Sequence, residues 1–189
     1  MECIDNIDRL LIYMISNSKN KDCNFILKTS EYKIIKDKFL EFFNNDSVIK
    51  KEFTTLNSKC YHIDKYIVKF GMFHIPDEVA ELPQLVKIYY RNNIEINYDN
   101  SIIFLGIEIQ DFIEEDDICS YNEIYELYKS LRKMGYIWID ANFSNVKKKN
   151  GKVLIIDSDF IYKENEADYF NQSTLSKELE EKYLKETEV

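Results

Sequence analysis

The stretch GYIWIDANFSNVKKKNGKVLIIDSDF, residues 135–160, decides how the rest of the chain is interpreted. Asp140 and Asn145 stand five residues apart, and Asp157 ends an apolar run further along. Between them, Asn150–Gly151 predicts a tight hairpin, because both residue types tolerate the positive φ that such a turn requires. Asp and Asn are also ordinary turn and cap residues. The stretch therefore holds either a phosphate-and-metal site or a set of turns.

Helices are predicted on both sides of this stretch. Ser120 followed by Glu123 has the pattern of a capping box, and Gly135 is a typical helix stop. Near the end of the chain, STLSKELEEKYLKET, residues 173–187, again has the composition of a helix. The second half of the chain is therefore expected to be mainly helical, with one hairpin in its middle.

The first half begins with two helical patterns and continues with short segments of strand character. Apolar residues recur at helical spacing in residues 3–16 and 30–44. Segments rich in β-branched and aromatic residues then predict five strands, at 47–53, 59–63, 66–71, 85–96 and 101–113. Residues 76–82 begin with Pro and acids, which favours a short helix after the third strand.

Composition restricts the partners of the protein. The chain has 189 residues and a net charge of −9, which argues against nucleic acid, because binding phosphates requires a basic surface. No window approaches the ~18 apolar residues of a membrane span, so we expect a cytoplasmic protein without one. Residues 108–117 are acidic, and they are either a solvated face or a docking surface for a basic protein partner.

Lys69 lies within the predicted third strand, in YIVKF. A Lys on a buried strand is costly unless it is paired, whereas a Lys on an edge strand reaches water. Phosphoryl transfer from ATP requires a cation on the phosphates, a carboxylate that orients the attacking hydroxyl, and an amide with an acid that hold magnesium. Lys69, Asp140, Asn145 and Asp157 occur in an order that supplies these parts.

Three segments resemble motifs of the protein-kinase-like superfamily. WIDANFSN resembles the catalytic loop HRDLxxxN, IIDSD resembles the strand that ends in DFG, and YIVKF resembles the VAIK strand. The resemblance covers roughly residues 47–165. It departs at Trp138 and Ile139, which replace the His and Arg before the catalytic Asp, and in the absence of glycine from TTLNSKCYHI, where a glycine-rich loop would lie.

The resemblance implies roles for particular residues. Asp140 and Lys69 would be catalytic, and the metal would be held by Asn145 and Asp157, with Asp159 as a further metal ligand. Residues implied in nucleotide binding are Lys69, its ion-pair partner Glu78 (with Glu81 as the alternative), Ser58 in the nucleotide loop, and Asp111 and Ile113 at the hinge.

The sequence thus predicts an α+β protein with a two-lobed, protein-kinase-like fold. Residues 1–46 would form a helical N-terminal extension, residues 47–113 an N-lobe with a five-stranded antiparallel sheet, and residues 114–189 a truncated helical C-lobe. The short chain after Asp157 resembles small atypical bacterial kinases, such as the aminoglycoside-phosphotransferase-like and lipopolysaccharide-kinase-like groups.

The expected function is phosphoryl transfer that depends on ATP and Mg²⁺, from the nucleotide to a small molecule or a protein of unknown identity. The alternative is a pseudokinase that acts as a protein-binding module through the acidic face 108–117. A metal-dependent hydrolase built on Asp157 and Asp159 is a more distant third, because no further acid or His cluster accompanies them.

Overall fold

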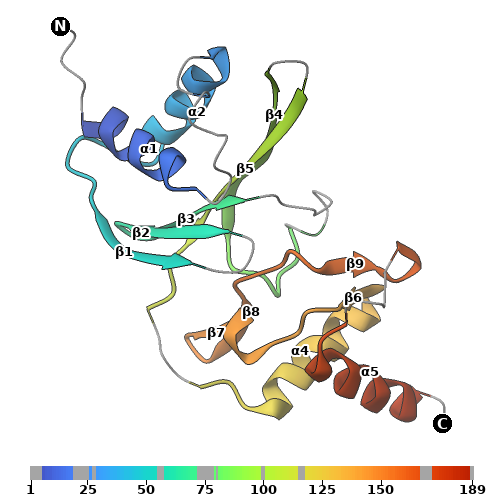
Figure 1. The fold of residues 1–189 in the computed structure, drawn as a ribbon. Helices are drawn as coiled ribbons and strands as arrows, with labels where there is room; N and C mark the ends of the chain where they lie inside the picture. Colours follow the sequence, from blue (N-terminus) through green and yellow to red (C-terminus); the bar gives the residue numbers. More distant parts are fainter. Residues whose placement is uncertain are drawn as a thin grey trace, which may run out of the picture. The chain divides into compact units, whose positions relative to one another are not determined.

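The chain folds into two compact units in the computed structural model (Figure 1). The first comprises Met1–Phe73 and Ile88–Phe112, and the second comprises His74–Lys87 and Ile113–Val189. The structure describes residues 6–18, 26, 29–54, 58–71, 79, 81–98, 101–114, 118–166 and 172–187. The chain passes from the first unit to the second after Phe112, where the sequence analysis places the hinge.

A five-stranded sheet forms the centre of the first unit. Its strands are β1 (Ile49–Thr54), β2 (Lys59–Ile63), β3 (Tyr66–Gly71), β4 (Ile88–Tyr98) and β5 (Ser101–Asp111). They lie in the order β1-β2-β3-β5-β4, and every neighbouring pair is antiparallel. The predicted α+β class and five-stranded antiparallel sheet are confirmed.

The fourth strand begins three residues later than the sequence predicts. Leu85 makes an isolated parallel bridge with Ile155 in the second unit, and Val86 donates its N–H to the Ile155 carbonyl at 2.9 Å. The apolar run 85–96 is therefore divided between the two units. Most of the predicted helix 76–82 lies outside the described residues.

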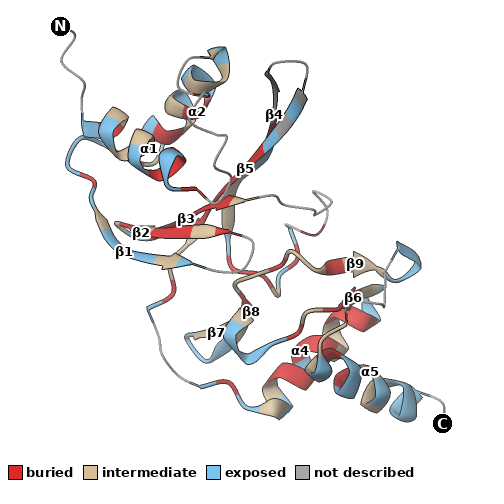
Figure 2. Cartoon of the chain, in the orientation of Figure 1, coloured by how far each residue is buried: buried red, intermediate tan, exposed pale blue. Residues whose placement is uncertain are grey.

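Helices α1 (Asn6–Ser16) and α2 (Ser30–Leu40) cover one face of this sheet. Ile7, Leu11 and Phe39 are at most 1% exposed and share a core with Val68 and other sheet residues. Figure 2 shows buried segments on α1, α2 and β3. Each such side chain contributes roughly 1.5–3 kcal/mol through burial. The two N-terminal helices therefore belong to the core of the first unit.

The opposite face of the sheet is polar at its centre. Side chains alternate between the faces of a strand, so Val68 and Phe70 point to the helices while Lys69 points away from them. Residues directly opposite each other in an antiparallel pair share a face. The register pairs Lys69 with Glu108 and Glu108 with Arg91, which places three charged residues on this second face.

The second unit contains two main helices and two small sheets. The helices are α4 (Tyr121–Lys133) and α5 (Thr174–Thr187), with the short 3₁₀ turns η2 (Phe143–Asn145) and η3 (Glu164–Glu166). Strand β6 (Tyr136–Trp138) pairs with β9 (Ile161–Lys163), and β7 (Val146–Lys149) pairs with β8 (Lys152–Ile155). Asn150 and Gly151 join β7 to β8 with φ values of 53° and 74°, as the predicted hairpin requires.

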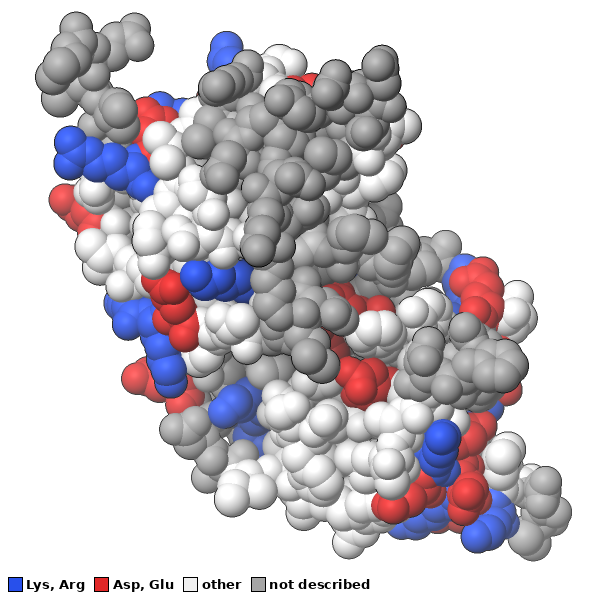
Figure 3. Space-filling view, viewed as in Figure 1, with Lys and Arg blue, Asp and Glu red and all other residues white. Residues whose placement is uncertain are grey.

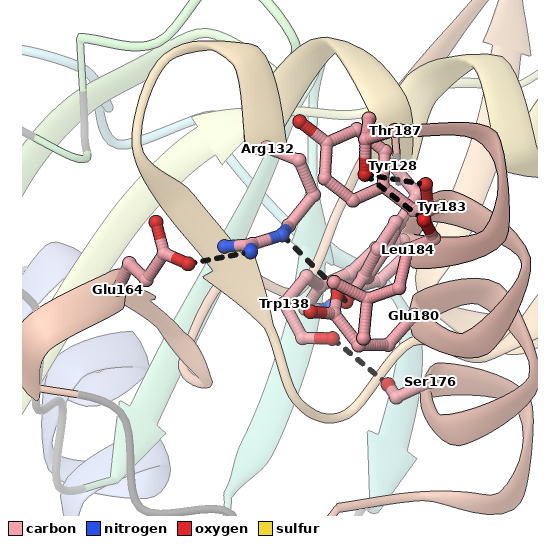
Figure 4. A network of polar contacts seen from close by, with 9 residues as sticks. All are labelled: Tyr128, Arg132, Trp138, Glu164, Ser176, Glu180, Tyr183, Leu184 and Thr187. Atoms are coloured by element: carbon pink, nitrogen blue, oxygen red, sulfur yellow. Dashed lines mark hydrogen bonds and ion pairs between the residues drawn. The ribbon is translucent and has the colours of Figure 1, made fainter. Parts of the chain in front are cut away.

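A polar network joins α4 to α5 within this unit (Figure 4). Arg132 of α4 pairs with Glu164 at 2.6 Å and with Glu180 of α5 at 3.1 Å. Tyr128 donates to the same Glu180 carboxylate at 2.7 Å. The Arg132 side chain is only 5% exposed, so its charge is balanced by the two acids rather than by water.

No helix in the described part of the chain is long and apolar enough to cross a membrane.

The predicted capping box at the start of α4 is formed. The Ser120 hydroxyl accepts from the Glu123 N–H at 3.3 Å, and the Glu123 carboxylate accepts from the Ser120 N–H at 2.8 Å. Together with Lys148, these bonds lower the pKa of Glu123 from 4.5 to about 2. The stabilisation that this carboxylate contributes is therefore present above pH 4.5 and is lost as the pH falls toward 2.

Replacing Ser120 with Ala is expected to lower the free energy of unfolding by about 1 kcal/mol, because the Glu123 N–H loses its side-chain acceptor. Urea denaturation followed by circular dichroism at pH 7 measures this loss. A Ser120→Ala protein whose midpoint matches that of the wild type would show that the cap does not stabilise the helix.

Candidate functional site

The cationic part of the candidate site lies on the polar face of the sheet in the first unit. The Lys69 Nζ atom of β3 lies 3.3 Å from Glu108 Oε1 of β5. Arg91 of β4 donates to the other oxygen, Oε2, through Nε and Nη2. The Glu108 side chain is fully buried, and those of Lys69 and Arg91 are 8% and 9% exposed. One buried carboxylate therefore serves two cations.

Three adjacent strands place these charges in one row across the sheet. A buried charge costs several kcal/mol unless it is paired and hydrogen-bonded, so each member of the row depends on the others. Arg91 approaches with two donors, a geometry that suits a carboxylate. The row carries a net charge of +1, with Lys69 held at a defined position. Chemically, such a cation can bind a phosphate group.

Lys69 pairs with Glu108, which is not the partner that the sequence predicts. The prediction that Glu108 belongs to a solvated face or a docking surface is wrong, because its side chain is fully buried. Glu78, the predicted partner of Lys69, lies outside the described residues, so its role stays a prediction. The alternative, Glu81, is exposed and belongs to the second unit. An acid within the apolar pattern LGIEIQ was the available signal for Glu108.

The other residues predicted to bind the nucleotide, Ser58, Asp111 and Ile113, occupy distinct places. Ser58 is buried, with its hydroxyl 3.6 Å from the Cys60 thiol, and strand alternation puts Cys60 on the same face as Lys69. Asp111, at the end of β5, accepts a hydrogen bond from the Tyr89 hydroxyl at 2.9 Å. Ile113 belongs to the second unit, where it is buried in a small apolar cluster. Their roles toward a nucleotide stay predictions.

In the second unit, the structure brings Asp140 and Asn145 into direct contact. The Asn145 Nδ2 atom donates to the Asp140 carboxylate at 3.3 Å and to the Asp140 carbonyl at 3.2 Å. Asn145 ends the 3₁₀ turn η2, whose first residues are held by Asn142: its side-chain oxygen accepts from the Ser144 N–H at 3.1 Å. The segment between Asp140 and Asn145 is thus a capped turn that returns the amide to the acid.

Asp157 is held close to the same pair by the hairpin. The Ile156 N–H donates to the Asn145 carbonyl at 2.9 Å, and Val146 pairs with Ile155 across β7 and β8. Burial raises the pKa of Asp140, the hydrogen bond from Asn145 opposes this, and the charge of Asp157 raises that pKa further. Asp140, Asn145 and Asp157 therefore form one electrostatically coupled group within the second unit.

Asp159 lies beyond this group, in the turn before β9. Ser158, between the two acids, is buried, and its carbonyl accepts from the Ile161 N–H at 3.2 Å. The turn thereby directs the chain away from the hairpin and into β9. Asp159 as a metal ligand stays a prediction.

The donors in this group fit Mg²⁺ better than a transition metal. Asn145 uses its Nδ2 atom on Asp140, which leaves the amide oxygen, 3.3 Å from the Ser144 hydroxyl, as a metal donor. Among the described residues, no three His, Cys, Asp or Glu side chains gather as a metal-binding cluster. Mg²⁺ prefers oxygen ligands, keeps several waters, and needs only one or two protein carboxylates when phosphates are also bound. Asp157 and Asn145 satisfy that requirement.

The sequence did not predict the residues that bond to the backbone around Asp140. Ser173, directly before α5, and Ser176, in its first turn, bond to the backbone of residues 138–141. They follow Asp140 by more than thirty residues, and no local motif connects them to it. Asn142 was detectable in principle, because Asn two residues before a turn N–H is a common cap.

The described part of the acidic segment 108–117 is only partly exposed. Lys and Arg side chains are interspersed with Asp and Glu side chains over the face drawn in Figure 3. Within 108–117, Glu108 is buried, Asp111 is bonded to Tyr89, and Glu114 is exposed. Residues 115–117 lie outside the described residues, so the docking role of that segment stays a prediction.

No protein-family model matches the chain, and none of the curated proteins is similar to it in sequence. Among solved structures, the chain is similar in fold to the LegK7 effector kinase of Legionella pneumophila, with 12% sequence identity and a TM-score of 0.40. The similarity covers 77% of this chain and 40% of that one, so the chain corresponds to less than half of the matched protein. The matched protein is described as an effector kinase.

Proposed function

We propose that the protein is a phosphotransferase that moves the γ-phosphoryl group of Mg·ATP to an alcohol group of a small molecule or protein. Asp140 would orient the acceptor hydroxyl and receive its proton. Asn145 and Asp157 would hold Mg²⁺, and Lys69 would hold the α- and β-phosphates. These are the parts that phosphoryl transfer requires, because its catalysis is mainly positioning and electrostatic stabilisation.

The observation that carries this proposal is the group formed by Asp140, Asn145 and Asp157. Asn145 donates to the Asp140 backbone carbonyl, as a turn residue does, and also to the Asp140 carboxylate, which links the two side chains. Two carboxylates lie close enough for the charge of Asp157 to raise the pKa of Asp140. A folded protein retains such repulsion where a cation is to be bound, and perturbed acids of this kind are enriched at functional sites.

The buried row Lys69–Glu108–Arg91 supports the phosphate-binding role of Lys69. Glu108 fixes the position of the Lys69 ammonium through the ion pair at 3.3 Å. Arg91 prevents the carboxylate from neutralising Lys69 completely, since it shares Glu108 with it. When bound, Mg²⁺ would neutralise the charge of the phosphate oxygens.

Binding of Mg·ATP is the first test of this function. Nucleotide at a hundredfold excess over its Kd should stabilise the protein by about 2.7 kcal/mol, and the shift should require Mg²⁺. A thermal-shift assay with ATP, with Mg·ATP and with Mg²⁺ alone measures it. No shift at millimolar Mg·ATP would favour the binding module over the enzyme.

Asp157→Ala should abolish ATP turnover and the Mg²⁺-dependent part of the thermal shift while the fold is retained, because it removes the metal carboxylate. Phosphate release from ATP and circular dichroism give the two readouts. Glu166→Ala, an exposed acid of the same unit, is the matched control and should turn over ATP like the wild type. Wild-type turnover by Asp157→Ala would disprove the metal assignment.

A further inference from the structure

Two serines at the start of α5 are bonded to the chain segment that carries Asp140. Ser176 is fully buried, and its hydroxyl lies 2.8 Å from both the Trp138 carbonyl and the Ala141 N–H. Figure 4 shows the Ser176 hydroxyl pointing to the Trp138 carbonyl. The same side chain therefore contacts the backbone before and after Asp140.

Ser173 completes these contacts from the preceding turn of the chain. Its N–H donates to the Ile139 carbonyl at 2.8 Å, and its hydroxyl donates to the Ala141 carbonyl at 2.9 Å. The same hydroxyl accepts from the Ser176 N–H at 3.1 Å, which caps α5. Four backbone groups of residues 138–141 are thus bonded to α5, on both sides of Asp140.

Both serine hydroxyls donate and accept hydrogen bonds in these contacts. A serine hydroxyl has one hydrogen and two acceptor lone pairs. Ser176 gives its hydrogen to the Trp138 carbonyl and accepts from Ala141, while the single hydrogen of Ser173 has two acceptors, the Ala141 carbonyl at 2.9 Å and the Ser176 hydroxyl at 3.0 Å. A buried group that is fully satisfied in this way fixes one conformation, because any other leaves polar atoms without partners.

We propose that the first turn of α5 positions Asp140 for phosphoryl transfer, with Ser176 and Ser173 as positioning residues that act through the backbone of residues 138–141. This rests on the proposed function, since it assigns the carboxylate of Asp140 to the reaction. The side chains of Trp138 and Ile139 are buried, and the Ile139 N–H donates to the Phe160 carbonyl at 2.9 Å. The bonds from Ser173 and Ser176 hold other backbone groups of the segment. The C-terminal helix is then part of the catalytic apparatus.

A positioning role predicts a loss in kcat with little change in KM. A misplacement of about 1 Å can reduce a rate 10²-fold, so Ser176→Ala should lower kcat for Mg·ATP hydrolysis by about 10–100-fold. KM for ATP should stay within about twofold, because Ser176 contacts none of the groups assigned to the nucleotide. Phosphate release at saturating and limiting Mg·ATP gives both constants.

The matched control is Ser130→Ala in α4. The Ser130 hydroxyl also donates to a backbone carbonyl, that of Leu127 at 2.7 Å, and it bonds Gln84, with no contact to residues 138–141. It should leave kcat unchanged. If Ser176→Ala fails to fold, Ser173→Ala carries the test, because Ser173 is only half-buried; a loss in kcat of roughly 3–10-fold is then expected.

Hydrogen exchange gives a readout that does not depend on activity. The Ala141 amide should exchange at least about tenfold faster in Ser176→Ala than in Ser130→Ala, because its acceptor has been removed. Unchanged exchange at Ala141, or faster exchange with wild-type kcat, would overturn the positioning role. A wild-type protein without Mg·ATP turnover would instead overturn the proposed function, and the exchange comparison would still decide whether α5 holds the segment.

Discussion

Asp140→Asn is expected to reduce turnover of Mg·ATP by about 10²- to 10⁴-fold, the range that a positioned acid or base contributes. An amide keeps the shape of the side chain and can still accept from Asn145, but it cannot take a proton. The loss should therefore appear in kcat while nucleotide binding is retained. Phosphate release and the thermal shift with Mg·ATP separate the two effects.

The same substitution should raise the stability of the protein at pH 7. Burial and the charge of Asp157 raise the pKa of Asp140, so the folded state disfavours its ionised form relative to the unfolded state. Stability associated with Asp140 is then fully present below the ordinary value of 3.8 and is lost as the pH rises through the raised pKa. Asparagine, which stays neutral, avoids that loss.

Melting temperatures of Asp140→Asn and the wild type at pH 7 and pH 3, without Mg²⁺, measure this effect. We expect a higher melting temperature for Asp140→Asn at pH 7 and a smaller difference at pH 3, where the wild-type acid is itself protonated. Turnover of Mg·ATP by the wild type should rise with pH, because Asp140 must be ionised to accept a proton. A lower melting temperature for Asp140→Asn at pH 7 would show that the bond from Asn145 outweighs burial and repulsion.

Features set by neighbouring residues were predictable from the sequence. The Asn150–Gly151 turn follows from the φ values that its two residues tolerate, and the box formed by Ser120 and Glu123 from a spacing of three. The hairpin brings the strand before Asp157 back to Asn145, whose carbonyl accepts from the Ile156 N–H. Each of these depends on contacts within about fifteen residues.

Features set by distant segments were not predictable. Glu108 faces Lys69 only because β5 pairs with β3, and its place among acids in the sequence suggested a solvated face. Ser176 meets residues 138–141 because α5 folds back on them. Leu85 leaves the apolar run of β4 because it bridges to Ile155. In each case the partner is chosen by tertiary packing, which single-sequence patterns do not encode.

Glu108→Gln is expected to lower the free energy of unfolding by about 3–5 kcal/mol, the cost of breaking a buried ion pair by removing one partner. Glu108 is the fully buried acid that Lys69 and Arg91 share. With a neutral amide in its place, the two cations face each other on one side of the sheet. Urea denaturation at pH 7, followed by far-ultraviolet circular dichroism, measures the loss.

Glu52→Gln in β1 is the matched control. Glu52 lies in the same sheet and also has two partners, the Tyr13 hydroxyl at 2.6 Å and the Lys59 ammonium at 3.3 Å, but its side chain is 34% exposed. Exposed ion pairs contribute about 0–1 kcal/mol, so this variant should remain close to the wild type. Similar losses for the two variants would show that burial of Glu108 is not what makes its charge important.

The triple variant Lys69→Met, Arg91→Leu, Glu108→Leu separates stability from function. Apolar side chains of similar size often replace a buried ion cluster without loss of stability, since none of the three charges then has to leave water. We expect the triple variant to regain most of the stability that Glu108→Gln loses, and yet to show no thermal shift with Mg·ATP, because the cation assigned to the phosphates is gone. A triple variant that is stable and still binds Mg·ATP would remove Lys69 from the nucleotide site. The row of charges would then be a purely structural element of the sheet.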